Sequence, residues 1–208
     1  MSDGGAAAFL QQAHRNNWQR YLASLAPDAR AGWDLCVITV NDSRQAAMCR
    51  RQLEWRREAG LLPARTGFVV LPDPPSACGR LGSGGATLHA LRVALNSAWT
   101  EMVTRGEMPA IGRPLAGDRI LIVHAGGDAA GIPHCSVTGR LFARVPRELP
   151  DGRASTIFDE LLISLSGLAG DVPPGVLIAS GDVLLVFDHL QLSFRRSGVI
   201  GVAAAAPA

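Results

Sequence analysis

The chain is organised around RILIVHAGGDAAGIPHCSVTGRLFARVP, which runs from Arg119 to Pro146. This stretch opens with an apolar run, Ile120 to Val123, that is rich in β-branched residues and long enough for a buried strand. The glycine pair Gly126–Gly127 follows, and glycine lets backbone N–H groups approach a ligand because it has no Cβ. Clustered amides typically bind phosphate. A tight turn leaving a sheet explains the same residues, so both interpretations stay open.

Length and composition indicate one folded globular domain. The 208 residues are 48% hydrophobic and 18% charged, which argues against disorder. The net charge of +2 gives no case for a nucleic-acid or membrane-surface protein. All 20 basic residues are arginine, so arginine must take any basic role at a site. Its planar fork suits phosphate, although it does not imitate the compact charge of lysine.

The cysteines and the N-terminal sequence indicate a cytoplasmic protein. Cys36, Cys49, Cys78 and Cys135 are scattered and form no C-x-x-C pair, as expected for reduced thiols rather than disulfides or zinc ligands. The N-terminus has no basic segment leading into an apolar stretch, so we expect no export signal. No run approaches the ~18 apolar residues that a membrane helix needs.

Strand and helix patterns alternate along the chain. A helical segment is expected within residues 1–30, ahead of a main domain at 31–208. The expected strands are 33–40, 66–71, 120–123 and 175–180, with a further strand beginning at 198, and the expected helices are 43–59, 86–98 and 155–168. Residues 99–118 are expected to form a connection. The alternation predicts an α/β fold, a mainly parallel sheet with helices on both faces.

Three features are expected to meet where the strands end, because ligands of open α/β sheets bind beyond the carboxyl ends of the strands. They are the pliant loop at 82–87, in which Ser83 or Thr87 can cap a helix or bind, the loop at 124–133, and Asp182. Two amide-rich loops facing one aspartate suit a nucleotide and Mg²⁺, which binds carboxylates together with phosphate oxygens. A turn or capping role explains Asp182 equally well.

Other polar residues have structural alternatives. For His124, a hydrogen-bonded structural role is favoured over a contact with phosphate. His134 and Cys135 are adjacent, and neighbouring residues of a strand point to opposite faces, so a thiol–imidazole pair is not favoured. Asp128 can help to hold magnesium, but an exposed or capping role is favoured.

Three stretches in order resemble a known family. GSGGATLHAL at 82–91, HAGGDAAGIP with GRLFARVP at 124–146, and ASGDVLLVFD at 179–188 are similar to the GDP-L-fucose pyrophosphorylase region of the fucokinase family. The similarity spans roughly residues 33–190. It implies a nucleotidyltransferase domain of the GT-A or Rossmann-like kind, incomplete at its C-terminus because relatives continue into further domains.

The resemblance also implies roles for residues. The phosphate-binding residues are expected to be Gly82, Ser83, Gly84, Gly85 and Thr87 in the first loop and Gly126, Gly127 and Asp128 in the second. Arg140 stands where the family usually has lysine, and Asp182 is the implied metal ligand. The implied reaction joins GTP (or ATP) to a sugar 1-phosphate, L-fucose 1-phosphate first among them, with release of pyrophosphate and with Mg²⁺ as cofactor.

The sequence departs from the family pattern after Gly127. Relatives usually carry a basic pair before the leucine–proline step, where this chain has Ala129, Ala130 and Gly131. Two alternative functions stay open. RLGSGGATLHAL also resembles the phosphate loop of GHMP-type small-molecule kinases, including L-fucokinase. A nucleotide-binding remnant that has lost catalysis is the other alternative.

Overall fold

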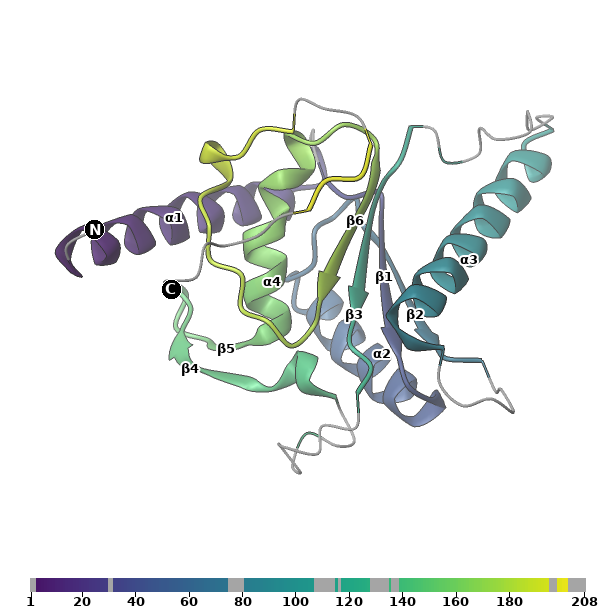
Figure 1. Ribbon diagram of the computed structural model, residues 1–208, viewed down its shortest axis with the longest axis horizontal. Helices are drawn as coiled ribbons and strands as arrows, with labels where there is room; N and C mark the ends of the chain where they lie inside the picture. Colours follow the sequence, from purple (N-terminus) through teal and green to yellow (C-terminus); the bar gives the residue numbers. More distant parts are fainter. Residues whose placement is uncertain are drawn as a thin grey trace.

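The computed structural model describes residues 3–29, 32–74, 81–106, 115, 117–127, 135, 139–194 and 198–201. Its centre is a four-stranded sheet in the order β2-β1-β3-β6, in which every pairing is parallel (Figure 1). The strands are β1 (Leu35–Val40), β2 (Gly67–Pro72), β3 (Arg119–His124) and β6 (Gly175–Ser180). This is the mainly parallel sheet that the sequence predicts.

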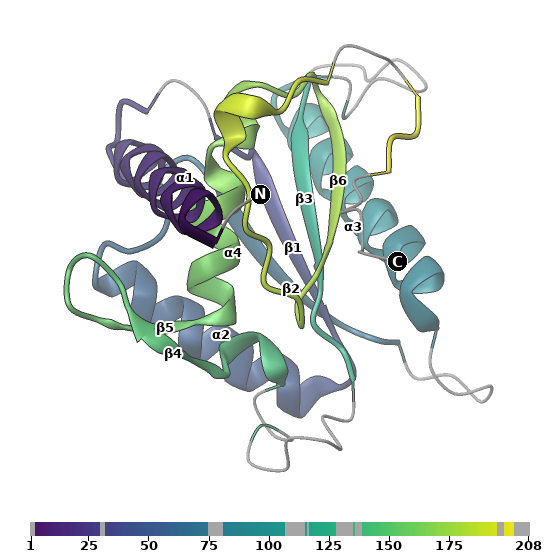
Figure 2. The ribbon, with the colours of Figure 1, turned by 60° about the vertical axis from the view of Figure 1, so that its left-hand side comes forward.

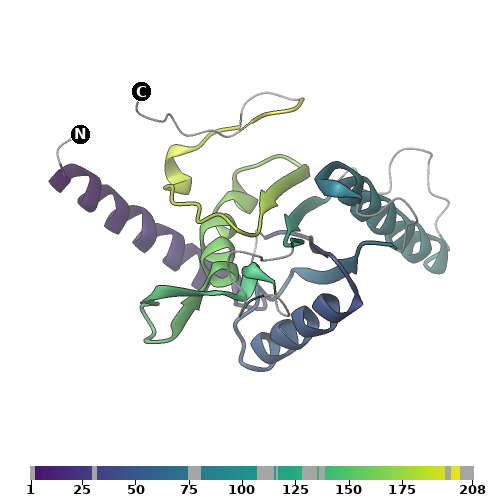
Figure 3. The same cartoon turned by 60° about the horizontal axis from the view of Figure 1, so that its bottom comes forward.

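Four α-helices surround the sheet: α1 (Asp3–Ser24), α2 (Ser43–Glu58), α3 (Gly82–Thr104) and α4 (Ile157–Ser166). Figures 2 and 3 show α3 on one side of the sheet and α2 and α4 on the other. The predicted helices on both faces are therefore confirmed. Helix α1 packs beyond α4, where it contacts α4 and the short 3-10 helix η4 (His189–Gln191).

The period of two along the strands divides the core between the faces. Val37, Ile120 and Ile122 pack with Ala90 and Ala94 of α3. The alternate positions face α2 and α4 and build the larger core cluster, together with residues of α1. The strand members of this cluster are Cys36, Ile38, Val40, Val70, Leu121, Val123 and Ala179. Small alanines therefore let α3 lie close to the sheet, while bulkier side chains fill the opposite face.

A small antiparallel hairpin lies beside this framework. Strand β4 (Arg144–Glu148) pairs with β5 (Ala154–Thr156), and the 3-10 helix η2 (Arg140–Phe142) leads into it. Thr156 then begins α4 as its N-cap, in a capping box with Asp159. Another 3-10 helix, η3 (Leu168–Gly170), follows α4.

Several sequence-based boundaries were wrong. Helix α3 begins at Gly82 rather than Ala86, so the glycines of the expected loop form its first turn, and it continues to Thr104 through part of the expected connection. The helix expected from residue 155 begins later, because residues 155 and 156 belong to the hairpin at 144–156. Residues 198–201 form no strand, and the remainder of the strand expected there lies outside the described residues.

Three of the four cysteines fall within the described ranges, and Cys36, Cys49 and Cys135 are free and buried there. Burial raises the pKa of the Cys49 thiol to about 12 and that of Cys36 further still. The Cys36 and Cys49 thiols therefore stay protonated and unreactive at neutral pH. None of the described helices combines the length and apolar character needed to cross a membrane.

Candidate functional site

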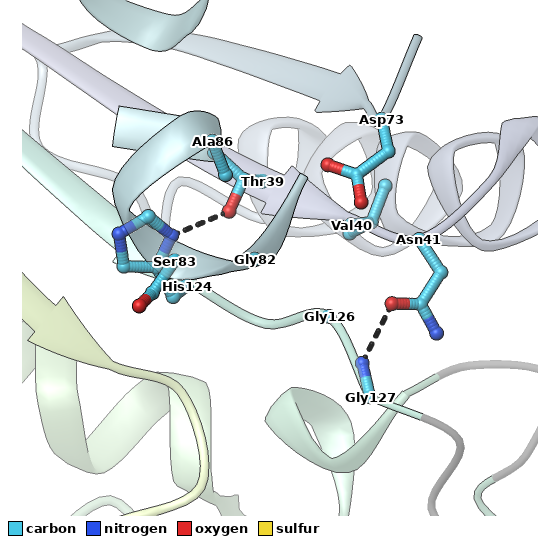
Figure 4. Close-up of a pocket in the computed structure, with 10 residues that line it drawn as sticks. All are labelled: Thr39, Val40, Asn41, Asp73, Gly82, Ser83, Ala86, His124, Gly126 and Gly127. Carbon is cyan, nitrogen blue, oxygen red and sulfur yellow. Dashed lines mark hydrogen bonds between the residues drawn. The ribbon is translucent and has the colours of Figure 1, made fainter. Parts of the chain in front are cut away.

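The strand order creates a natural ligand site. The chain passes from β1 to β2 on one side and returns through α3 to β3 on the other side of β1. Connections leave the carboxyl ends of β1 and β3 in opposite directions, which opens a crevice between them. A cavity of about 160 Å³ lies there (Figure 4), here called the carboxyl-end cavity. Its lining residues are Thr39, Val40, Asn41, Asp73, Gly82, Ser83, Ala86, His124, Gly126 and Gly127.

The first turn of α3 forms one wall of this cavity. Its N-cap residue, Leu81, makes no side-chain capping hydrogen bond, and the first turn contains no acidic side chain. The first-turn amides of a helix have no acceptor within the helix, and they carry the positive end of the helix dipole. Gly85 lets the turn pack on Leu81, since a Cβ there would lie 2.8 Å from the Leu81 Cβ. The wall can therefore bind an anion.

His124 connects the sheet to this wall. Its Nδ1 lies 2.8 Å from the Thr39 hydroxyl of β1, and its Nε2 lies 2.9 Å from the Thr87 hydroxyl of α3. Burial lowers the pKa of His124, while the nearby charge of Asp73 acts in the opposite direction. The hydrogen bonds expected for His124 are therefore present, and its ring also lines the cavity.

Asn41 holds the glycine pair that follows β3. Its Oδ1 accepts a hydrogen bond of 2.8 Å from the Gly127 N–H (Figure 4). The approach requires glycine at position 126, because a Cβ there would lie 2.8 Å from the same oxygen. Gln45 of α2 donates to the Gly127 carbonyl at 3.4 Å. The glycine loop is thus fixed from the β1 side of the crevice.

Arg140 and Asp182 meet beside the cavity. Arg140 Nη1 lies 3.3 Å from Asp182 Oδ2, and Ser180 donates to the other carboxylate oxygen. Both residues line a small hollow that shares His124, Gly126 and Gly127 with the carboxyl-end cavity. The Nε of Arg140 is buried and has no hydrogen-bond partner among the described residues. A buried unpaired donor is costly, so this N–H is suited to an acceptor brought by a ligand.

Gly181 permits this arrangement. Its N–H donates to the His124 carbonyl at 2.7 Å. A Cβ at this position would lie 2.9 Å from that oxygen and 3.1 Å from the Ala125 Cα. The turn after β6 therefore crosses close to the end of β3, and this contact carries Asp182 to the edge of the hollow.

The structure brings most of the predicted site residues together. Gly82, Ser83, Gly126 and Gly127 line one cavity, and Arg140 and Asp182 line the adjoining hollow. Gly84, Gly85 and Thr87 lie in the first two turns of α3 but do not line the cavity. Ser83 and Thr87 do not cap α3. Asp128 and His134 lie outside the described residues.

Sequence reasoning missed three polar residues of the cavity: Thr39, Asn41 and Asp73. Asn41 and Asp73 directly follow β1 and β2, so their position after an apolar run was an available signal. Asp42, the residue after Asn41, caps α2 by accepting from the Arg44 and Gln45 amides.

The described residues contain no group of three or more histidine, cysteine, aspartate or glutamate side chains placed to hold a metal ion. A cation at Asp182 must therefore take most of its ligands from water or substrate. Mg²⁺ commonly binds in this manner, through one or two carboxylates and the oxygens of a phosphate. The exposed carboxylate of Asp182, at a strand end beside an anion-binding wall, fits that mode.

Comparison with known proteins agrees with the resemblance seen in the sequence. A family model described as the fucose pyrophosphorylase domain matches residues 112–208. The bifunctional fucokinase/GDP-fucose pyrophosphorylase of Arabidopsis thaliana is 29% identical over 208 residues, covering 93% of this chain and 19% of the relative. The fucose-1-phosphate guanylyltransferase of Mus musculus is 24% identical, covering 94% and 31%.

The fucose-1-phosphate guanylyltransferase of Homo sapiens is 27% identical over 173 residues, covering 79% of this chain and 24% of the relative. The chain thus spans between about a fifth and a third of the length of these relatives. No solved structure gives a significant match. The matched family region contains β3, Arg140, β6 and Asp182, and so covers one side of the crevice.

Proposed function

We propose, from the similarity to fucose pyrophosphorylases and the geometry of the crevice, that this domain takes part in nucleotidyl transfer from GTP to L-fucose 1-phosphate. The products would be GDP-L-fucose and pyrophosphate. The observation that carries the proposal is the meeting of two glycine turns with one arginine–aspartate pair at the switch point of the sheet. A cytoplasmic location stays a prediction.

The reaction requires no covalent intermediate with the protein. An oxygen of the sugar phosphate attacks the α-phosphorus in line; a new P–O bond forms as the bond between the α-phosphorus and the bridging oxygen breaks, and the electron pair leaves with pyrophosphate. Catalysis then depends on positioning and on stabilising the charge of the transferring group. The amides at the start of α3 are donors for phosphate oxygens, and Arg140 is a fixed cation beside them.

Asp182 is the carboxylate that we propose for Mg²⁺, which supplies neutralising charge on the phosphates when it is bound. Arg140 pairs with Asp182 through Nη1 alone, and its buried Nε remains unpaired among the described residues. Arg140 is therefore suited to donate from Nε to a phosphate oxygen while it stays close to Asp182. Arg140 also offers a cation to a chain that has alanines and glycine in place of the basic pair of the relatives.

The size of the cavity defines which part of a nucleotide it suits. Pockets that enclose a drug-sized ligand are typically about 300–1,000 Å³. The carboxyl-end cavity of about 160 Å³ is smaller than this and suits the phosphate groups. The base and the sugar would then lie against other parts of the protein.

The kinase alternative is not favoured. The matching model is that of a pyrophosphorylase domain, and two of the relatives are named guanylyltransferases. The stretch that resembles a kinase phosphate loop forms the start of α3, and this helix packs against a parallel sheet of the predicted nucleotidyltransferase kind.

The test is calorimetric titration of the purified chain with GTP and with ATP, with and without Mg²⁺, followed by pyrophosphate exchange with fucose 1-phosphate. We expect GTP binding that needs Mg²⁺ and weakens by about tenfold or more in Asp182→Asn. Asp151→Asn is the matched control, because Asp151 forms a similar ion pair with Arg153 in the β4–β5 turn. Binding without exchange would select a nucleotide-binding remnant. Tighter binding of ATP, unaffected by Asp182→Asn, would contradict the proposal.

A further inference from the structure

We propose that His124 is a positioning residue that, as its neutral Nε2–H tautomer, holds the first turn of α3 against the end of β1. The inference rests on the proposed function, because it concerns the wall that would bind the nucleotide phosphates. His124 lines both the carboxyl-end cavity and the adjoining hollow. Its ring, however, is already engaged by two protein hydroxyls, and these contacts assign its role.

The hydrogen-bond chain fixes the tautomer. The Thr87 hydroxyl donates to the Ser83 carbonyl at 2.9 Å. A hydroxyl has one hydrogen, so the Thr87 oxygen can only accept from His124 Nε2, which lies 2.9 Å away. In the neutral ring Nδ1 is then an acceptor, and it accepts from the Thr39 hydroxyl at 2.8 Å. The protons thus run in one direction, from Thr39 through His124 and Thr87 to the backbone of Ser83.

This chain joins three elements at the mouth of the cavity. Thr39 is the penultimate residue of β1, His124 is the last residue of β3, and Thr87 and Ser83 belong to the first two turns of α3. Further along, α3 rests on the sheet through apolar contacts of Ala90, Ala94 and the partly buried Leu91. The polar chain restrains the helix at the end where its first-turn amides face the cavity. Its loss would let this turn move relative to Gly126 and Gly127.

The surroundings favour the neutral ring. Burial and the positive end of the α3 dipole disfavour an imidazolium, and Asp73, which follows β2, favours it. Arg140 and Asp182 face the ring from the hollow as a mutually compensating pair. The first turn of α3 presents no acidic side chain, and the β1 partner, Thr39, does not titrate. The uncompensated acidic neighbour is therefore Asp73 alone among these groups.

Direct contact with phosphate is the rival role, and pH separates the two. A histidine that binds phosphate directly does so best as a cation, so GTP binding would strengthen as pH falls from 8 to 6. A neutral positioning residue gives no such gain. The protonation state in the free protein is read by ¹⁵N–¹H correlation of the ring nitrogens, where we expect Nε2–H alone at pH 7.5. An Nδ1–H tautomer or an imidazolium there would overturn the proposal.

Substitutions separate positioning from simple support of the fold. In His124→Gln the amide can reach Thr87 as Nε2 does, whereas in His124→Asn it reaches only as far as Nδ1. We expect GTP affinity to fall by about tenfold in His124→Asn and Thr87→Val, the effect of one lost hydrogen bond, and to be largely retained in His124→Gln. The double variant His124→Asn with Thr87→Val should be no weaker than either single variant.

The control is Thr100→Val, which removes the same kind of hydroxyl-to-carbonyl bond, to Asn96, from the far end of α3. Amide hydrogen exchange at Thr87 and Leu88, whose helical acceptors are Ser83 and Gly84, should accelerate in Thr87→Val but not in Thr100→Val. Hydrogen exchange and the histidine tautomer are both measured without nucleotide. They therefore test the positioning role of His124 even if the protein does not bind GTP and the proposed function is wrong. Equal exchange in Thr87→Val and wild type would overturn the proposal.

Discussion

The carboxylate of Asp159 on α4 receives two hydrogen bonds from the guanidinium of Arg56 on α2, at 2.8 Å from Nε and 3.0 Å from Nη2. The two side chains are only 10% and 3% exposed. The guanidinium also lies 5.0 Å from the centre of the Phe142 ring and 5.3 Å from that of Phe158. This pair joins the two helices that cover one face of the sheet.

Removal of one partner should be costly, because the other charge is left buried without compensation. We expect Arg56→Met to lower the free energy of unfolding by about 3–5 kcal/mol. Arg153→Met is the matched control: its pair with Asp151 is more exposed, so the loss should be about 0–1 kcal/mol. Urea unfolding followed by tryptophan fluorescence measures both. Similar losses in the two variants would contradict a special role for the buried pair.

The same pair predicts a pH dependence. Burial opposes ionisation of Asp159, but the hydrogen bonds and charge of Arg56, with help from Thr156, outweigh it and lower the pKa of the carboxyl. A depressed pKa in the folded state stabilises the protein at pH values above the unfolded value of about 3.9. That stabilisation is lost as pH falls through the folded pKa. The pH dependence of unfolding below about pH 4 should therefore be shallower in Asp159→Asn than in wild type.

Gly181→Ala should disturb both stability and the site. The added methyl would lie 2.9 Å from the His124 carbonyl oxygen and 3.1 Å from the Ala125 Cα, and backbone atoms cannot turn aside. We expect a loss of about 1–3 kcal/mol in urea unfolding, as for other overpacked positions, together with weaker GTP binding because Asp182 is displaced. Gly117→Ala, where a Cβ meets nothing within 4 Å, serves as control and should leave both unchanged.

Gly84→Ala should separate stability from binding. Gly84 lies in the first turn of α3, and a Cβ there meets no protein atom within 4 Å. Because alanine favours helix over glycine, we expect a gain of about 0.5 kcal/mol in the free energy of unfolding. If phosphate approaches these amides closely, as proposed, GTP affinity should fall in the same variant. Unchanged affinity in calorimetry would exclude close approach at this position.

Arg140→Lys tests whether the planar guanidinium group of Arg140 is needed at the site. Lysine keeps the charge but lacks the Nε–H that is buried and unpaired among the described residues. We expect GTP affinity to fall by about tenfold, even though lysine is the residue that the family usually carries. Arg153→Lys, at the other arginine–aspartate pair, should bind as wild type does. GTP binding in Arg140→Lys that is as tight as in wild type, or tighter, would show that the positive charge alone suffices.

The framework of the fold was predictable because its signals are local. The apolar runs before Asn41 and Ala125 are strands of the sheet, and Asp42 caps α2 as its side chain allows. The predicted start of α3 was too late in the sequence because glycine lowers helix propensity. Packing of the helix on Leu81 and on the sheet offsets this local cost. The hairpin was missed because Pro146 argues against a strand and β5 has only three residues.

The site was predictable in its glycines and incomplete in its polar partners. Gly82 and Gly126 were found from the sequence because each belongs to a glycine cluster, and both line the cavity. Thr39 and Asp73 join them only because β1 lies between β2 and β3, an order that no local pattern records. The Thr39–His124–Thr87 chain likewise depends on register across the sheet and on the rotation of α3 about its axis.

Helix α1 forms hydrogen bonds with residues that are synthesised much later than the helix itself. Asn17 donates to the Phe187 carbonyl and accepts from the His189 ring, 172 positions further along, and Asn16 donates to Asp188. Ribosomes add about 5–20 residues per second, so α1 waits roughly 10 to 35 s before these partners emerge. Closing so long a segment is also entropically slow. The contacts of Asn16 and Asn17 with residues 187–189 therefore form only after β6 has been synthesised, whereas α1 can pack on α4 earlier.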